Sequence, residues 1–189
     1  MIQKEKVKTL VSELLTTLNL DLKNPSLRET PERMARMFCD EVFSSLKEVP
    51  PVLTVFPNEG YDEIIMFDSI PYASVCEHHF VFFNGLAYLL YIPDKLLVGA
   101  SKVARLIDYF CRKPQIQERL TMEIINHFCS VVAPKGAMLV MRGSHGCMSF
   151  RGVKTGKDAG MVTSSLFGGF KNPGMEEKGL SLIQFAIMD

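Results

Sequence analysis

The order of helical and strand-like segments limits the folds open to this chain. Two stretches separated by Pro114 carry an apolar residue every three or four positions, the first at Val103, Leu106, Ile107 and Phe110 and the second at Leu120, Ile124, Ile125 and Phe128. This spacing predicts two amphipathic helices. Strand-like segments precede them at 63–69, 76–83 and 86–92 and follow them at 136–143 and 145–152. Asn84-Gly85 predicts a hairpin turn between 76–83 and 86–92, and the Gly-rich stretch 155–160 predicts a mobile loop. The fold class is therefore α+β.

The first 50 residues have a different character. One helical stripe comprises Val7, Leu10, Val11, Leu14, Leu15 and Leu18. Thr30-Pro31 then places a capping hydroxyl and an N1 proline before a second helix. A proline-punctuated linker, 47–62, follows. We predict an N-terminal helical segment over 1–50 and a single α+β domain over 51–189.

Composition excludes several functions. Lys+Arg and Asp+Glu both count 21, so no overall field favours nucleic acid or an anionic membrane as a partner. The apolar run 86–92 is far too short to span a bilayer, and the start of the chain lacks the pattern of a signal peptide. The 5 cysteines are an odd number without the spacing of a disulfide framework. We expect a cytoplasmic protein without disulfides.

Two clusters of metal-ligating residues stand far apart in the sequence. Cys76 and His79 form a C-x-x-H pair, which on its own is as compatible with a packed thiol and a core imidazole as with a pair of metal ligands. The stretch 145–151 repeats the same residue types. Taken as a strand, it puts one set of side chains on one face, namely His145, Cys147, Ser149 and Arg151, with Met148 and Phe150 toward the core.

Together the clusters offer three ligands suited to Zn²⁺: Cys76, His79 and Cys147. Three protein ligands plus water are typical of a catalytic zinc site, whereas structural sites are closed by four. A zinc-bound water with a pKa of about 7 is a source of hydroxide, and His78 and His145 stand beside the ligands as candidates for proton transfer. The pattern favours hydrolysis at an electrophilic carbon.

A third cluster indicates an anionic substrate. Lys102 and Arg105 lie one turn apart at a helix N-terminus, with Ser101 as a possible cap. A solvated helix face is the commoner explanation of such a pair, but Arg151 on the face of Cys147 favours phosphate binding. Glu118 has a carboxylate that can accept two donors from a guanine edge, although a glutamate on a mixed helix is ordinarily just solvated.

These residues give the chain a resemblance to the zinc-dependent GTP cyclohydrolase I family. The resemblance is carried by the blocks "LNLDLKNPSLRETPERMARMFCDEVFSSL", "CEHHFVFFNG", "GASKVAR", "RKPQIQERLT", "HGCMSFRGV" and "TSSLFGGF", in order and over nearly the whole chain. It implies a T-fold, in which antiparallel strand pairs and two helices assemble with neighbouring copies into an oligomeric barrel. The usual particle is a decamer of two pentamers, with active sites between subunits.

The resemblance also implies roles. Cys76, His79 and Cys147 correspond to the zinc ligands, His78 and His145 to the proton-transfer residues, and Glu118 to the guanine anchor. The triphosphate is assigned to Ser101, Lys102, Arg105 and Arg151, together with Arg33 of a neighbouring subunit. The implied reaction adds a zinc-activated hydroxide to C8 of GTP, releases formate, and gives 7,8-dihydroneopterin triphosphate after rearrangement. The sequence does not indicate which pterin pathway follows, nor a regulatory partner.

Two positions depart from the family pattern, and two other functions stay open. Ala100 stands where leucine is common, and Gly146 where a larger residue is usual; both bear on affinity more than on reaction type. One alternative is a T-fold relative acting on a different purine-like substrate, for example by nitrile reduction with a cysteine nucleophile. The other is a non-catalytic, zinc-bearing assembly module, which needs neither His78 nor Glu118. Release of formate from GTP separates these functions.

Overall fold

The computed structural model describes residues 2–156 and 159–188, and the chain divides into two compact units, Met1–Val49 and Pro50–Asp189. Lys157 and Asp158, in the middle of the predicted Gly-rich loop, lie outside the described residues. The neighbouring residues 155, 156, 159 and 160 belong to neither a helix nor a strand. No helix in the described part of the chain is long and apolar enough to cross a membrane.

The first unit is helical. It contains α1 (Lys4–Thr17) and α2 (Thr30–Arg36), and α2 runs on through a π-helical turn (Met37–Val42) and a 3-10 turn (Ser44–Leu46). Val11 and Leu15 of the predicted apolar stripe are buried. Pro31 occupies the first turn of α2 as predicted, but the capping prediction is wrong. The helix already includes Thr30, the preceding residue is Glu29, and no side chain caps the helix.

The second unit is built on a five-stranded sheet with the order β5-β2-β3-β6-β7. Its strands are β2 (Ile65–Cys76), β3 (Phe82–Ile92), β5 (Pro114–Gln115), β6 (Gly136–His145) and β7 (Met161–Gly168). All neighbours are antiparallel except the short parallel pair of β2 and β5. A separate two-stranded ribbon joins β1 (Val55–Pro57) to β4 (Leu96–Val98).

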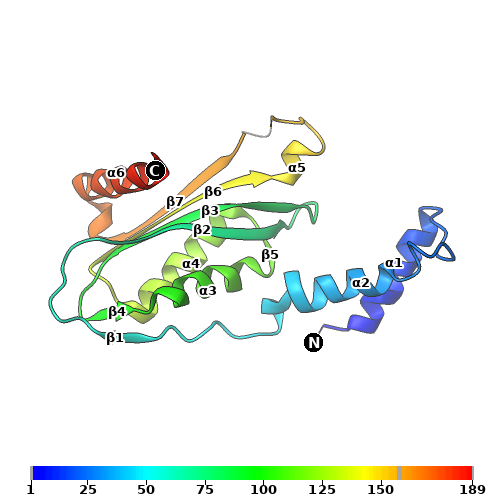
Figure 1. Cartoon of the computed structure of the whole chain (residues 1–189), viewed down its shortest axis with the longest axis horizontal. Coiled ribbons are helices and arrows are strands. Elements are labelled where there is room, and N and C mark those ends of the chain that lie inside the picture. The colour runs from blue at the N-terminus through cyan, green and yellow to red at the C-terminus, as the bar shows by residue number, and fades with distance from the viewer. Residues whose placement is uncertain (1, 157–158, 189) are drawn as a thin grey trace. The chain divides into compact units, whose positions relative to one another are not determined.

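Helices cover both faces of this sheet (Figure 1). Between β4 and β6 the chain forms α3 (Ala100–Cys111) and α4 (Gln117–Val132), as predicted from the two apolar stripes. Every residue of those two stripes is buried. Successive residues of β3 point to opposite faces, so Leu89 and Tyr91 pack in the core shared with α3 and α4, while Tyr88 and Leu90 pack on the other side.

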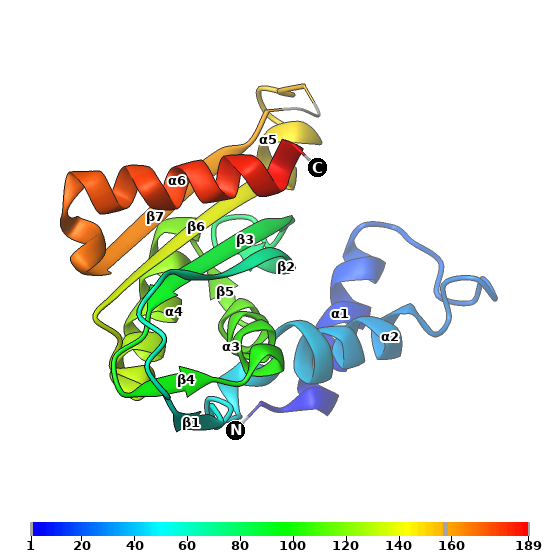
Figure 2. The same ribbon diagram turned by 60° about the vertical axis from the view of Figure 1, so that its left-hand side comes forward.

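The opposite face is covered by α6 (Pro173–Met188), a helix that the sequence analysis did not predict. Figure 2 shows it lying across β6 and β7, on the side away from α3 and α4. Ile183 packs there in a second core with Phe170 and Met138. Gly179 allows this approach, because a Cβ at that position would lie 2.9 Å from a ring carbon of Phe170 and 3.0 Å from the sulfur of Met138.

The predicted hairpin at Asn84-Gly85 is wrong. Both residues lie inside β3, where Asn84 pairs with Ala73 and Gly85 with Tyr72, and the chain reverses instead in the turn between Cys76 and Phe82. The glycine is required by a neighbouring strand: a Cβ on Gly85 would lie 1.8 Å from the carbonyl oxygen of Arg142 in β6.

The prediction of a strand over 145–152 is also wrong. β6 ends at His145, and residues Gly146–Ser149 form the short helix α5. Met148 and Phe150 are exposed and do not reach the core. Gly146 is buried at the start of this turn, where a Cβ would lie 2.5 Å from a methyl carbon of Val81 and 2.8 Å from the carbonyl oxygen of Phe82, so this backbone leaves no room for a side chain there.

Candidate metal and substrate site

The turn after β2 presents the first two candidate ligands. Cys76 is the last residue of the strand, and its amide donates to the carbonyl of Val81 at 2.9 Å. The amide of Phe80 donates back to the carbonyl of Cys76 at 2.9 Å, with Phe80 in the left-handed region at φ 54°. This tight reversal holds Cys76 and His79 on one turn.

Strand pairing brings the third candidate ligand to this turn. His145 at the end of β6 pairs with Phe83 near the start of β3, and α5 then carries Cys147 back toward Cys76. The ligand atoms of Cys76, His79 and Cys147 all lie within 4.8 Å of one another. In a tetrahedral zinc site, ligand atoms about 2.3 Å from the ion lie slightly less than about 4 Å from one another. A small movement of these three side chains toward a common point would therefore let them bind one zinc ion.

The chemistry of this donor set fits zinc. Two thiols and one imidazole are borderline-soft ligands, and three protein ligands leave a fourth position for water or substrate. The cysteine at 76 is buried, Cys147 is half-buried, and His79 is exposed, so the group is closed on one side and accessible on the other. Burial and the neighbouring thiol of Cys76 raise the pKa of Cys147 in the metal-free group. All 5 cysteines are free, and Cys39, Cys111 and Cys129 are buried outside this group.

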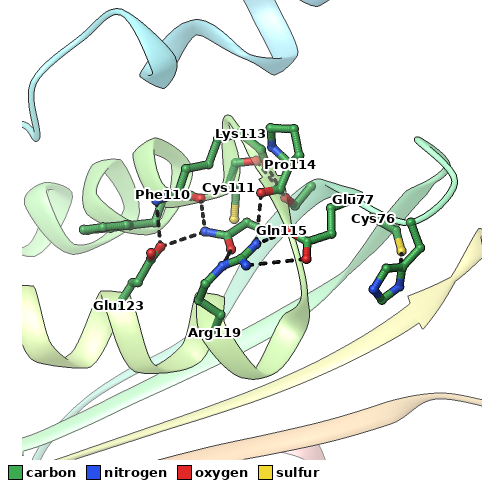
Figure 3. Close-up of polar contacts among 11 residues, drawn as sticks. Cys76, Glu77, Phe110, Cys111, Lys113, Pro114, Gln115, Arg119 and Glu123 are labelled. Atoms are coloured by element: carbon green, nitrogen blue, oxygen red, sulfur yellow. Dashed lines mark hydrogen bonds and ion pairs between the residues drawn. The ribbon is translucent and has the colours of Figure 1, made fainter.

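Glu77, a residue of this turn that sequence reasoning did not single out, ties the turn to α4. Its carboxylate forms an ion pair with Arg119 of α4, and the hydrogen bond from Arg119 lowers the pKa of Glu77. Arg119 also donates from Nε to the side-chain oxygen of Gln115 at 2.9 Å, and the Gln115 amide donates to Glu123 at 2.8 Å (Figure 3). The buried Gln115 thus links the turn to the N-terminal part of α4.

His145 is held in a defined position next to this group. Its ring stacks on Phe83 with centroids 4.6 Å apart and planes 3° apart. Its Nε2 lies 2.8 Å from the side-chain oxygen of Gln117. Burial lowers the pKa of His145, and the nearby carboxylate of Glu118 acts in the opposite direction.

The other candidates on this side of the molecule lie around the same group. His78 is exposed, with Nδ1 3.8 Å from the sulfur of Cys76. Glu118 is exposed on the first turn of α4, close enough to His145 to affect its pKa. Arg151 is exposed just after α5, and its charge lowers the pKa of Cys147 against the larger effect of burial.

Three further predicted anion-binding residues lie toward the start of α3, away from the contact of that helix with β2. Ser101, Lys102 and Arg105 lie in the N-terminal half of α3, whereas the other end of that helix is tied to β2 by the Ser74 hydroxyl, which donates to the carbonyl of Cys111 at 2.7 Å. At a rise of about 1.5 Å per residue, Ser101 lies about 15 Å along the helix from that contact. The prediction that Ser101 caps α3 is wrong, because Ser101 lies inside the helix, whose N-cap is Gly99, and no side chain accepts a hydrogen bond from the first amides.

Arg33 belongs to the first unit. It is exposed on α2, pairs with Glu29 at 3.4 Å, and donates to the carbonyl of Ser26 at 3.1 Å. Its side chain is therefore occupied by local contacts within that unit.

Comparisons with known proteins identify the family. The family model for GTP cyclohydrolase I matches residues 7–184. A GTP cyclohydrolase 1 from Acetivibrio thermocellus is 43% identical over 170 residues, covering 89% of this chain and 90% of the relative. The GTP cyclohydrolase 1 of Shewanella loihica is 38% identical over 182 residues, covering 95% and 85%.

Among solved structures, the archaeosine synthase QueF-Like in the apo form covers 56% of this chain and 94% of its own, with a TM-score of 0.44 and 13% identity. That likeness is too low to bear on the assignment. The family model matches most of the chain, and the two relatives cover 89% and 95% of it at 43% and 38% identity. This chain belongs to the GTP cyclohydrolase I family.

Proposed function

We propose that this protein is a zinc-dependent GTP cyclohydrolase, which opens the imidazole ring of GTP at C8, releases formate and yields 7,8-dihydroneopterin triphosphate. The observation that carries the proposal is the convergence of Cys76, His79 and Cys147 on one point, beside a fixed histidine. Family membership supplies the substrate. In the overall reaction, both C–N bonds at C8 break, two waters add, and closure of the new ring returns one of them.

Cys76, His79 and Cys147 would hold the zinc ion. When bound, zinc supplies a Lewis acid and lowers the pKa of a coordinated water to about 7. Glu77 and Arg119 fix the turn that carries two of these ligands, and outer contacts of this kind commonly change metal affinity by about 10–100-fold when removed.

The chain's own acid–base groups would handle the protons. His145 delivers a proton to N7 of the imidazole ring as it opens, and His78 serves the later proton transfers of the ribose rearrangement. Glu118 accepts hydrogen bonds from the guanine edge, and Arg151 binds the triphosphate. The proximity of Glu118 to His145, and of Arg151 to Cys147, supports placing base and phosphates around one centre.

We further propose that the active site is shared between copies of the chain. Along α3, Ser101 and Lys102 lie about 14–15 Å, and Arg105 about 9 Å, from the contact that ties the helix to β2, so we infer that a neighbouring copy brings these residues to the metal group. Both outer strands of the sheet, β5 and β7, also have an edge available for pairing. The expected particle is a barrel of T-fold domains formed by residues 51–189, most simply a decamer of two pentamers, with 1–50 as a helical extension and Arg33 from a neighbour at the phosphates.

Release of formate from GTP tests the function. Zinc-loaded, reduced protein should release one formate for each GTP consumed, with a pterin as the other product. The Cys147→Ser variant should lose at least about 100-fold in rate, since a ligand is removed. Cys129→Ala removes a thiol outside the metal group and serves as the matched control.

Two outcomes would contradict the proposal. Zinc binding without formate release would identify a metal-bearing assembly module, and turnover of another purine-like compound in place of GTP would identify a relative with different chemistry.

A further inference from the structure

We propose that Gln117 is a positioning residue that fixes which ring nitrogen of His145 carries the hydrogen. The proposal rests on the role in proton transfer given above to His145. Gln117 is the first residue of α4, directly before Glu118, and only 1% of its surface is exposed. Its side chain lies between β6, β7 and His145, so each of its polar atoms needs a partner within the protein.

Two backbone carbonyls determine how the Gln117 amide is oriented. Nε2 lies 3.0 Å from the carbonyl oxygen of Met141 and 3.1 Å from that of Met161. A carbonyl oxygen can only accept, so the nitrogen must face it. Exchanging the amide nitrogen and oxygen would set three buried oxygens against one another and leave the amide hydrogens without these acceptors.

Hydrogen bonds to two threonines, Thr121 and Thr163, require the same orientation of the Gln117 amide. The Thr121 hydroxyl donates to the backbone carbonyl of Gln117 at 2.7 Å, which uses its only hydrogen. Thr163 lies 2.6 Å from Thr121 and must therefore donate to it. The Thr163 oxygen is then left to accept from Gln117 Nε2 at 3.1 Å. The two hydrogens of Gln117 Nε2 thus serve three acceptors, one hydrogen being shared, whereas an oxygen in this place would face the same three acceptors with no hydrogen at all.

The side-chain oxygen of Gln117 is thereby the atom that faces His145. It is an acceptor 2.8 Å from His145 Nε2, so that ring nitrogen must carry a hydrogen. In the neutral ring this leaves the lone pair on Nδ1, so Nδ1 must first accept the proton that His145 later delivers to N7. Phe83 sets the plane of the ring by stacking, and Gln117 sets the position of the hydrogen within that plane.

Gly143 makes room for this arrangement. A Cβ there would lie 2.6 Å from the side-chain oxygen of Gln117 and 2.5 Å from the hydroxyl of Tyr72. Gly143→Ala should therefore displace Gln117 from His145. The Tyr72 hydroxyl is buried and has no hydrogen-bond partner in the described part of the chain, so Tyr72→Phe changes the same corner without removing a bond to Gln117.

The test is nitrogen NMR of zinc-loaded, full-length protein with ¹⁵N-labelled histidine, recorded above neutral pH. The wild-type spectrum should show the hydrogen of His145 on Nε2. Gln117→Met keeps the length of the side chain without its acceptor, and should give a mixture of the two neutral forms. Gly143→Ala, which moves the Gln117 oxygen away from His145, should give a similar mixture, and Tyr72→Phe should leave the wild-type form unchanged.

Kinetics give a second readout. Gln117→Met should lower kcat for GTP by about 100-fold, the lower range for loss of a positioned acid–base group, with KM changed far less. Gly143→Ala should act in the same direction, and Tyr72→Phe should keep the wild-type kcat.

A wild-type hydrogen on Nδ1 overturns the proposal, whether or not any variant folds. So does a Gln117→Met enzyme whose His145 keeps the wild-type form. These results are separable from the proposed function: an active enzyme with the hydrogen on Nδ1 refutes only the positioning role, and an inactive wild type with the hydrogen on Nε2 refutes only the activity.

Discussion

Replacing Gly85 with alanine should destabilise the protein strongly, because the glycine sits where two strands meet closely. The added Cβ would lie 1.8 Å from the carbonyl oxygen of Arg142, 2.8 Å from its carbon and 2.9 Å from Cα of Gly143. All three are backbone atoms, so no side-chain rotation relieves the clash. For the distance from the Cβ to the Arg142 oxygen to reach even 3.0 Å, β3 and β6 must separate by more than about 1 Å. This lengthens the hydrogen bonds between the strands from about 2.9 Å to a distance at which they no longer form.

The size of the effect follows from these distances. Overpacking of this kind costs about 1–3 kcal/mol, and the loss of two ladder hydrogen bonds costs about 1 kcal/mol each. The total is about 3–5 kcal/mol, which lowers Tm by about 6–20 °C for a chain of this size. Gly85 pairs with Gly143, two residues from His145, so activity should fall together with stability.

Thermal unfolding of zinc-loaded protein at one fixed concentration measures this. Gly156→Ala is a matched control, because a Cβ there meets nothing within 4 Å. Asn84→Thr is a second control: a β-branched residue suits the exposed strand position seen here but would be strained in an Asn-Gly hairpin turn. An unchanged Tm for Gly85→Ala, or a large loss for Asn84→Thr, would refute the assignment of this pair to the interior of β3.

Three further predictions concern the site. Glu118→Gln should abolish the preference for guanine nucleotides, since it places a donor where the guanine edge also donates; competition assays with other purine nucleotides measure this, and an intact preference would exclude Glu118 as the guanine anchor. Arg151→Ala should raise KM for GTP more than it lowers kcat and should spare guanosine; equal losses for both substrates would contradict a phosphate role. Arg119→Met should speed zinc release to a chelator by about 10-fold or more, because Glu77 loses its ion-pair partner. Arg112→Met removes an exposed ion pair with Asp108 and is the control, which should release zinc at the wild-type rate.

Local pattern predicted those parts of the fold that depend on one segment at a time. The stripes of α3 and α4 are buried as their spacing indicates, since an amphipathic helix has only one face to pack. Asn84-Gly85 was wrongly predicted to be a turn. A glycine is needed there because the backbone carbonyl of Arg142, which is far away in the sequence, packs against it. The helix α6 carries Gly174 and Gly179, which weaken a helical pattern, and the close packing of Gly179 on Phe170 outweighs their cost only in the folded state.

The candidate site also contains residues that the sequence predicted and residues that only the fold reveals. Cys76, His79 and Cys147 were predicted from residue type and spacing, and the structure brings them together even though α5 takes the place of the expected strand. Gln117 gave no signal, because a glutamine on a helix has no chemistry of its own until its neighbours in space are known. Glu77 stood between two ligands in the sequence, but its partner Arg119 lies across a turn of the fold.

Titration of activity against bound zinc tests the central claim most directly. Metal-free, reduced protein would be loaded in steps, and formate release from GTP measured at each zinc content. We predict a rate that rises in proportion to zinc and levels off at about one ion per chain, the capacity of one three-ligand site. Full activity in metal-free, reduced protein, or a fully loaded site that releases no formate, would contradict the assignment of Cys76, His79 and Cys147 as the catalytic metal centre.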